Sequence, residues 1–276
     1  TLAIAAMAVG FSSMTFAGDI RIATGSEGGG YESVGKRIDM TNSQEKGHDF
    51  DFEILNTAGS GENISMFNAE EAEIMVVQSD ALNVNRPSIP FKAKNNTPEY
   101  VFWIYNKSLK IKDIEEIEGK KDLAMVLIED SGAVTTMQSF VLEDDGYKVN
   151  LDTAIYAYDL YEAVSYVADG TYDGRKVAGM LYVGSKIPAE IVKDFGSKIA
   201  IGEATDGDFD DAKDVNGNKL YKDCKIKEVA IRGLETSTWG KPNTVCVDSM
   251  IVYNTTIFKN KKEERALLKG IIKATR

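Results

Sequence analysis

The chain has 276 residues, with 43 acidic and 32 basic side chains and a formal net charge of −11. No stripe of Lys and Arg runs along it, so nucleic acid and anionic membrane surfaces are not expected as partners. The length is sufficient for a full hydrophobic core, and it lies where one core tends to divide into two.

The first residues have the pattern of an export signal. Residues 2–11 are apolar but too few to span a bilayer, and Thr15-Phe16-Ala17 ends in a small residue. We expect residues 1–17 to be a truncated signal peptide that is removed, leaving a soluble, monomeric, periplasmic protein. A buried N-terminal helix is the alternative. No cysteine stands directly after this segment, so a lipid anchor is not expected.

Cys224 and Cys246 are the only cysteines of the chain. In the oxidising periplasm they can form a disulfide across adjacent strands. Two unpaired, buried thiols are the alternative, and the spacing alone does not decide between them.

Strand and helix patterns alternate along the chain, which predicts an α/β fold with parallel sheets covered by helices. Strands are expected at residues 20–23, 52–55, 74–77, 100–105, 122–128, 154–158, 177–183, 226–231 and 245–253. Helices are expected at residues 31–44, 63–68, 131–142, 159–168 and 259–275, with a short one opened by Pro188. Residues 91–98 and 202–223 are expected to be loops.

The first three strands each end in small polar residues at the start of a helix. The sequences after them are Thr24-Gly25-Ser26-Glu27-Gly28-Gly29-Gly30, Asn56-Thr57-Ala58-Gly59-Ser60-Gly61-Glu62-Asn63 and Gln78-Ser79-Asp80. Such junctions place unpaired backbone N–H groups around one crevice, and such a crevice attracts anions. We therefore predict a binding site for a small anionic ligand.

Individual residues of these loops are predicted to contact the ligand. Gly29 allows close approach of the backbone, Ser26 offers a hydroxyl and Tyr31 an aromatic wall, with Glu27 beside them. The other candidates in this part of the chain are Thr57, Ser60, Glu62, Asn63, Gln78 and Ser79. Ser60 and Asp80 also suit helix N-caps. Glu62 either pairs with a ligand ammonium group or only complements the helix dipole.

The order of these three loops resembles the TAXI solute-binding proteins, the extracytoplasmic subunits of one class of TRAP transporters. The resemblance is close over residues 20–82 and looser at residues 130–132 and 246–254. It implies a two-lobed periplasmic-binding-protein fold of the second type, with hinge-crossing strands at residues 100–105 and 245–253. One lobe would comprise residues 18–99 and 254–276, and the other residues 100–253.

The resemblance also implies the rest of the site and its partner. A carboxylate would lie at the helix start that contains Ser131 and Gly132, with Tyr182 and Gly184 on the same wall. The ligand would be a glutamate-like amino acid or a dicarboxylate, and the partner a TRAP-type membrane permease. A periplasmic ligand-sensing domain and a small-molecule enzyme on the same scaffold are the alternatives.

Other motifs give no support for a metal, a cofactor or catalysis. Residues 30–36 match the letters of a nucleotide-binding P-loop, but Arg37 stands where Ser or Thr must hold Mg²⁺. The acidic loop at residues 206–211 lacks the glycine that an EF-hand requires. His48, expected near a helix end, is the only histidine, so neither a zinc site nor a Ser-His or Cys-His set is expected.

Overall fold

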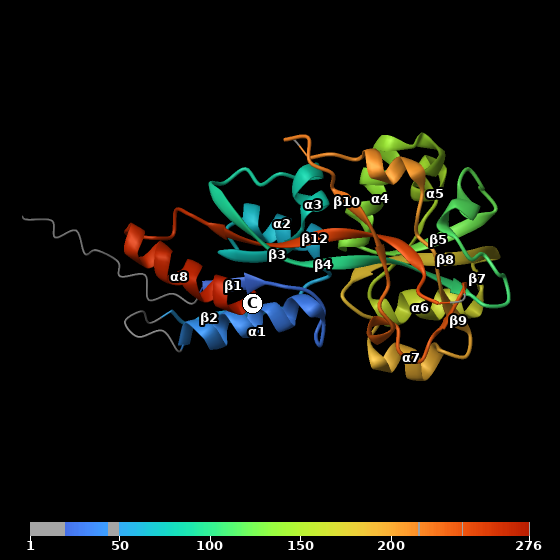
Figure 1. Ribbon diagram of the computed structural model, residues 1–276, viewed down its shortest axis with the longest axis horizontal. Helices are drawn as coiled ribbons and strands as arrows, with labels where there is room; N and C mark the ends of the chain where they lie inside the picture. The colour runs from blue at the N-terminus through green and yellow to red at the C-terminus, as the bar shows by residue number, and fades with distance from the viewer. Residues whose placement is uncertain (1–19, 44–49, 215, 239, 276) are drawn as a thin grey trace, which may run out of the picture.

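The computed structural model describes residues 20–43, 50–214, 216–238 and 240–275. The predicted signal segment and His48 lie outside these residues. The molecule is elongated, with one group of helices and strands at each end of its long axis (Figure 1). Among the described residues, no helix combines the length and the apolar character needed to cross a membrane.

The first lobe is built on three parallel strands in the order β2-β1-β3. These strands are β1 (Ile20–Ala23), β2 (Phe52–Leu55) and β3 (Ile74–Gln78). The helices around them are α1 (Gly30–Ser43), α2 (Ser60–Asn68), α3 (Ser79–Val84) and the C-terminal α8 (Lys261–Ala274). Ile22, Ile38 and Ile271 are fully buried between α1, α8 and the sheet, so the chain's last helix completes the core of its first strands.

The second lobe contains the middle of the chain and has its own core around Trp103, Phe140 and Tyr147. Its strands are β5 (Leu123–Ile128), β6 (Ile155–Ala157), β7 (Thr171–Tyr172), β8 (Arg175–Gly184), β9 (Ile199–Gly202), β10 (Tyr221–Lys225) and β11 (Glu235–Thr236). Its α-helices are α4 (Gly132–Glu143), α5 (Lys148–Asp152), α6 (Leu160–Asp169) and α7 (Ala189–Phe195). Strands β6, β5 and β8 are parallel, as in the first lobe.

Two long strands, β4 (Phe91–Asn106) and β12 (Asn243–Asn254), run between the lobes. The first half of β4 pairs with β12, and its second half pairs with β8 and β9 of the second lobe. Strand β12 pairs with β3 over Ser249–Tyr253 and with β10 over Asn243–Val247. The expected pair of crossing strands is therefore present.

Two predictions of local structure were wrong. Residues 91–98 are the first half of β4 and not a loop, because β12 pairs with this polar segment across its backbone. Residues 226–231 are not a strand; the strand is β10, which ends at Lys225, and Glu228–Ala230 form a short 3₁₀ turn. In both cases backbone pairing with β12 sets the structure, and the pattern of side chains does not reveal it.

Cys224 and Cys246 form a disulfide with a Cα–Cα distance of 5.9 Å. The two residues lie on neighbouring antiparallel strands, β10 and β12, and are offset along them because Cys224 pairs with Thr244. The bridge therefore ties the β10 edge of the second lobe to one of the two strands that cross between the lobes.

Candidate ligand-binding site

A cavity of about 110 Å³ lies between the lobes, where the loops after β1 and before α2 and the end of β3 face the starts of α4 and α6 and the end of β8. Nine of the predicted residues line it: Ser26, Gly29, Tyr31, Ser60, Gln78, Ser131, Gly132, Tyr182 and Gly184. On this measure a cavity holds one water molecule in about 10–15 Å³, so this one has room for a small organic ligand.

The start of α4 has groups that suit an anion. Ser131 is 7 % exposed, it lines the cavity, and its Oγ has no hydrogen-bond partner among the described residues. It stands at the N-cap position of α4 but makes no side-chain cap bond. The first N–H groups of a helix have no intrahelical partner, and together with a free hydroxyl they suit a carboxylate.

The start of α2 is closed by the other lobe instead of being open to a ligand. The N–H groups of Gly61 and Glu62 donate to the Asp130 carbonyl oxygen at 3.0 and 3.2 Å. A Cβ at Gly61 would lie 2.6 Å from that oxygen, so the contact requires glycine. Ser60 is not the N-cap, which is Gly59; its Oγ accepts from the Gln78 N–H at 3.1 Å. The start of α4, and not that of α2, is therefore the candidate anion site.

Glu99 is a part of the cavity that the sequence did not predict. This carboxyl group on β4 is 4 % exposed, and Tyr31 donates its hydroxyl to Glu99 Oε2 at 2.8 Å. Burial raises the pKa of Glu99 to about 7, while hydrogen bonds from Tyr31 and Gln78 act in the opposite direction. The available signal was its position, an acidic residue directly before the β-prone run at the lobe junction.

Asp80 joins the two lobes beside the cavity. Its Oδ2 accepts from the Thr136 hydroxyl of α4 at 2.6 Å and from the Tyr221 hydroxyl of β10 at 2.7 Å. The residue is fully buried, and burial raises the pKa of its carboxyl group. The predicted N-cap role was wrong, since α3 starts at Ser79 after Gln78. Asp80, Thr136 and Tyr221 form an interlobe hydrogen-bond cluster.

The other predicted residues do not line the cavity. Thr57 and Asn63 bind each other and the Thr24 carbonyl oxygen inside the first lobe. Glu27 is exposed. Glu62 accepts from the Ala58 N–H at 2.7 Å, so its carboxylate serves its own loop and helix start. Ser79 lines a different hollow.

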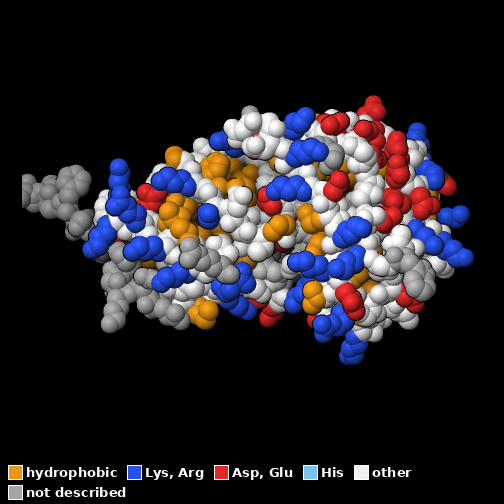
Figure 2. All heavy atoms as spheres, viewed as in Figure 1, with side chains coloured by type: hydrophobic (Ala, Val, Ile, Leu, Met, Phe, Trp, Pro, Cys, Tyr) orange, Lys and Arg blue, Asp and Glu red, His pale blue; other side chains and the backbone are white. Residues whose placement is uncertain are grey.

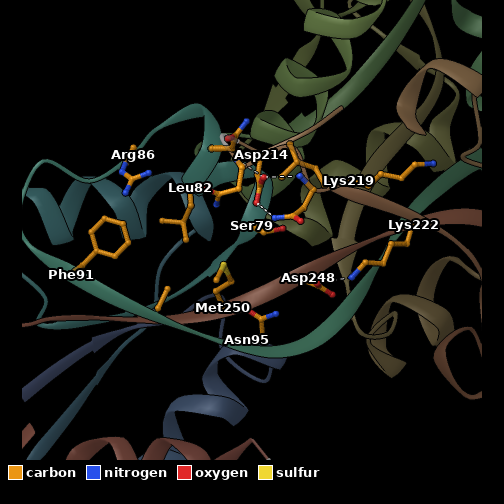
Figure 3. A pocket seen from close by; sticks show the side chains of 15 residues that line it. Ser79, Leu82, Arg86, Phe91, Asn95, Asp214, Lys219, Lys222, Asp248 and Met250 are labelled. Carbon is orange, nitrogen blue, oxygen red and sulfur yellow. Dashed lines mark hydrogen bonds and ion pairs between the residues drawn. The ribbon is translucent and has the colours of Figure 1, made fainter. Parts of the chain in front are cut away.

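That second hollow is larger, about 760 Å³, and lies between α3, β4 and the residues at 214 and 216–222 (Figure 3). Its charged groups largely satisfy one another. Lys222 pairs with Asp248 at 2.8 Å, and Asp214 accepts from the backbone and side chain of Asn218. Only Ser79 among the predicted ligand contacts is found here, so this hollow is not the candidate site.

Acidic side chains gather over the part of the second lobe near α4 and α5 (Figure 2). Carboxylate oxygens of Glu118, Asp144 and Asp206 lie within 4.8 Å of one another there. Desolvation, and then repulsion from Asp144 and Asp206, raise the pKa of Glu118. These three carboxylates do not line the cavity and add nothing to the candidate site.

The described architecture is that of the two-lobed periplasmic-binding-type domains. The effector binding domain of QuiR in complex with shikimate superposes with a TM-score of 0.53 at 9% identity, covering 94% of this chain and 97% of that one. The GluR0 ligand binding core in complex with L-glutamate gives a TM-score of 0.53 at 8% identity, covering 94% and 93%. No curated protein sequence matches the chain. The chain belongs to the NMT1-like family, whose sequence profile matches residues 22–189.

Proposed function

We propose that the protein is the extracytoplasmic solute-binding subunit of a TRAP-type transporter of the TAXI class. It captures a small anionic solute, a glutamate-like amino acid or a dicarboxylate, between its lobes and delivers it to a membrane permease. The observation that carries this proposal is Ser131, a buried hydroxyl without a partner that faces an interlobe cavity at the start of a helix.

Three further features support binding and delivery over catalysis. The segments whose order resembles that of the TAXI proteins supply the first-lobe wall of the cavity. The lobes touch through the Asp130 carbonyl and the interlobe hydrogen-bond cluster, so a ligand between them stabilises one closed arrangement. No histidine or cysteine is among the lining residues. The serine hydroxyls there therefore have no histidine beside them that could activate them as nucleophiles.

A thermal-shift screen of amino acids and carboxylates tests the binding function. A ligand at 100 times its dissociation constant stabilises the folded state by about 2.7 kcal/mol and raises the melting temperature. A ligand that is chemically altered during incubation would favour an enzyme. If no compound of the panel shifts the melting temperature, the proposed function is wrong.

Transport and export need their own measurements. Solute uptake into liposomes that contain the permease should require the binding protein, whereas a ligand-sensing domain would bind the same solute without supporting uptake. We also propose that the mature chain is periplasmic, monomeric and begins near Gly18. Mass spectrometry and light scattering of the exported protein check this, and retention of residues 2–11 would contradict it.

A further inference from the structure

The charges that line the cavity are unusual for a site that takes an anion. Three lining residues carry charged side chains: Glu99, Asp159 and Lys186. Asp159 and Lys186 are exposed, and the Asp159 carboxylate caps α6 by accepting from the Glu162 N–H at 2.8 Å. Glu99 alone of the three is buried. The buried part of the wall therefore holds a carboxyl group and no basic side chain.

The surroundings of Glu99 leave a negative charge on it uncompensated. Tyr31 from α1, Gln78 from β3 and Tyr182 from β8 line the cavity with it, and the charge of Asp80 acts on it from α3. Arg37 and Lys186 line a third hollow, distinct from that of Figure 3, which also reaches Glu99. Glu99 nevertheless forms no ion pair with any basic side chain of the described residues. A buried charge without a partner is costly, so a ligand cation here would be strongly favoured.

Gln78 connects Glu99 to the start of α4. Its side chain is a hydrogen-bond partner of Glu99, and a Cβ placed at Gly132 would lie 2.3 Å from Gln78 Nε2. Glu99 and Gly132 therefore both contact the Gln78 side chain. An α-amino acid carries its ammonium and carboxylate groups on one carbon atom, so a ligand beside this amide can reach an acceptor and a helix start that share one neighbour.

We infer that Glu99 selects α-amino acids by accepting the ligand's ammonium group, while the start of α4 and Ser131 hold the α-carboxylate. The inference rests on the proposed binding function and narrows its ligand class from small anions to zwitterions. A dicarboxylate would place a second negative charge beside Glu99 and would bind only when that group is protonated. Tyr31, which donates to Glu99, orients its carboxylate in the ligand-free protein.

Titration calorimetry with L-glutamate and with glutarate, which differs only by lacking the amino group, tests this assignment. At pH 8 the protein should bind L-glutamate more tightly than glutarate by about 10-fold or more, the value of a hydrogen bond between charged groups. Glu99→Gln should reduce this preference to less than about threefold. Glu118→Gln, a charge-matched change outside the cavity, should leave the preference unchanged.

The pH dependence of the wild type gives a second readout that needs no variant. Ionisation of Glu99 around pH 7 should strengthen L-glutamate binding by about tenfold between pH 6 and pH 8. Weaker L-glutamate binding at pH 8 would overturn the inference, because it would make Glu99 a proton donor to the ligand. Equal affinity for both compounds, unaffected by Glu99→Gln, would overturn the inference but leave the binding function standing. Failure of both compounds and of the whole carboxylate panel to bind would overturn both proposals.

Discussion

Replacing Ser131 with alanine separates ligand binding from helix capping. In the ligand-free protein the hydroxyl is buried without a partner and makes no cap bond. Its removal should therefore not lower the free energy of unfolding, although loss of an ordinary N-cap costs about 1 kcal/mol. In the complex the hydroxyl donates to a carboxylate. Loss of that charge-assisted hydrogen bond costs about 1.5–3 kcal/mol, so the affinity should fall about 10- to 150-fold.

Ser60→Ala is the matched control, because Ser60 lies on the opposite wall of the same cavity. Its Oγ is fully buried and accepts from the Gln78 N–H at 3.1 Å. Alanine leaves this N–H without an acceptor, and the free energy of unfolding of the ligand-free protein should fall by about 1–3 kcal/mol. The two serines look alike in the sequence but should differ in which measured quantity changes.

Titration calorimetry gives the affinities, and urea unfolding of the ligand-free proteins gives the stabilities. Ser131→Ala should lower the affinity and leave the urea midpoint unchanged. If it lowers the midpoint as Ser60→Ala does while the affinity stays the same, Ser131 only supports the helix and the anion site is elsewhere.

Three other measurements test the structure around the site. Denatured but unreduced protein should show no free thiols, and two labelled thiols would contradict the bridge. The disulfide closes a loop with a sequence separation of 22, so its reduction should lower the free energy of unfolding by about 3 kcal/mol. Tyr221→Phe removes one hydrogen bond to the buried Asp80 carboxyl group and should cost about 1.5–3 kcal/mol in urea unfolding, whereas an unchanged midpoint would mean that the interlobe hydrogen-bond cluster contributes nothing. Burial raises the pKa of Glu99 to about 7 from about 4.3 in an unfolded chain, so the protein should lose up to about 3 kcal/mol relative to Glu99→Gln as the pH rises from 4 to 7. A difference that does not change with pH would show that Glu99 titrates normally.

The sequence predicted those parts of the fold whose signal is local. Strands β1, β2 and β3 were found as apolar runs, and α1 and α2 were found because glycine-rich loops precede them in the chain. The first half of β4 was missed because its partner is more than 150 residues away, as in the pairing of Asn95 with Met250. Its side chains are mostly exposed and polar, so no apolar pattern marks the strand.

The site was predicted in the same uneven way. The glycine-rich loop after β1 pointed to Gly29, and the family resemblance pointed to Ser131 and Gly184; all three line the cavity. Glu99 was missed because only contact between the lobes buries its carboxyl group. Asn63 was misplaced because its amide donates to backbone carbonyls of Thr24 and Val76 inside the first lobe. Sequence spacing gives the end of an element but not the direction in which a side chain points.

Helix α4 connects ligand binding to the contact between the lobes. Its start carries Ser131 and the first backbone N–H groups of the helix, and Thr136, little more than one turn further on, donates to Asp80 of the first lobe. A ligand at the start of α4 that also reaches Glu99 therefore favours the same arrangement of the lobes as the interlobe hydrogen-bond cluster. The apparent affinity falls in proportion to the fraction of molecules in that arrangement. Tyr221→Phe, which lies outside the cavity, should for this reason weaken ligand binding as well as lower stability.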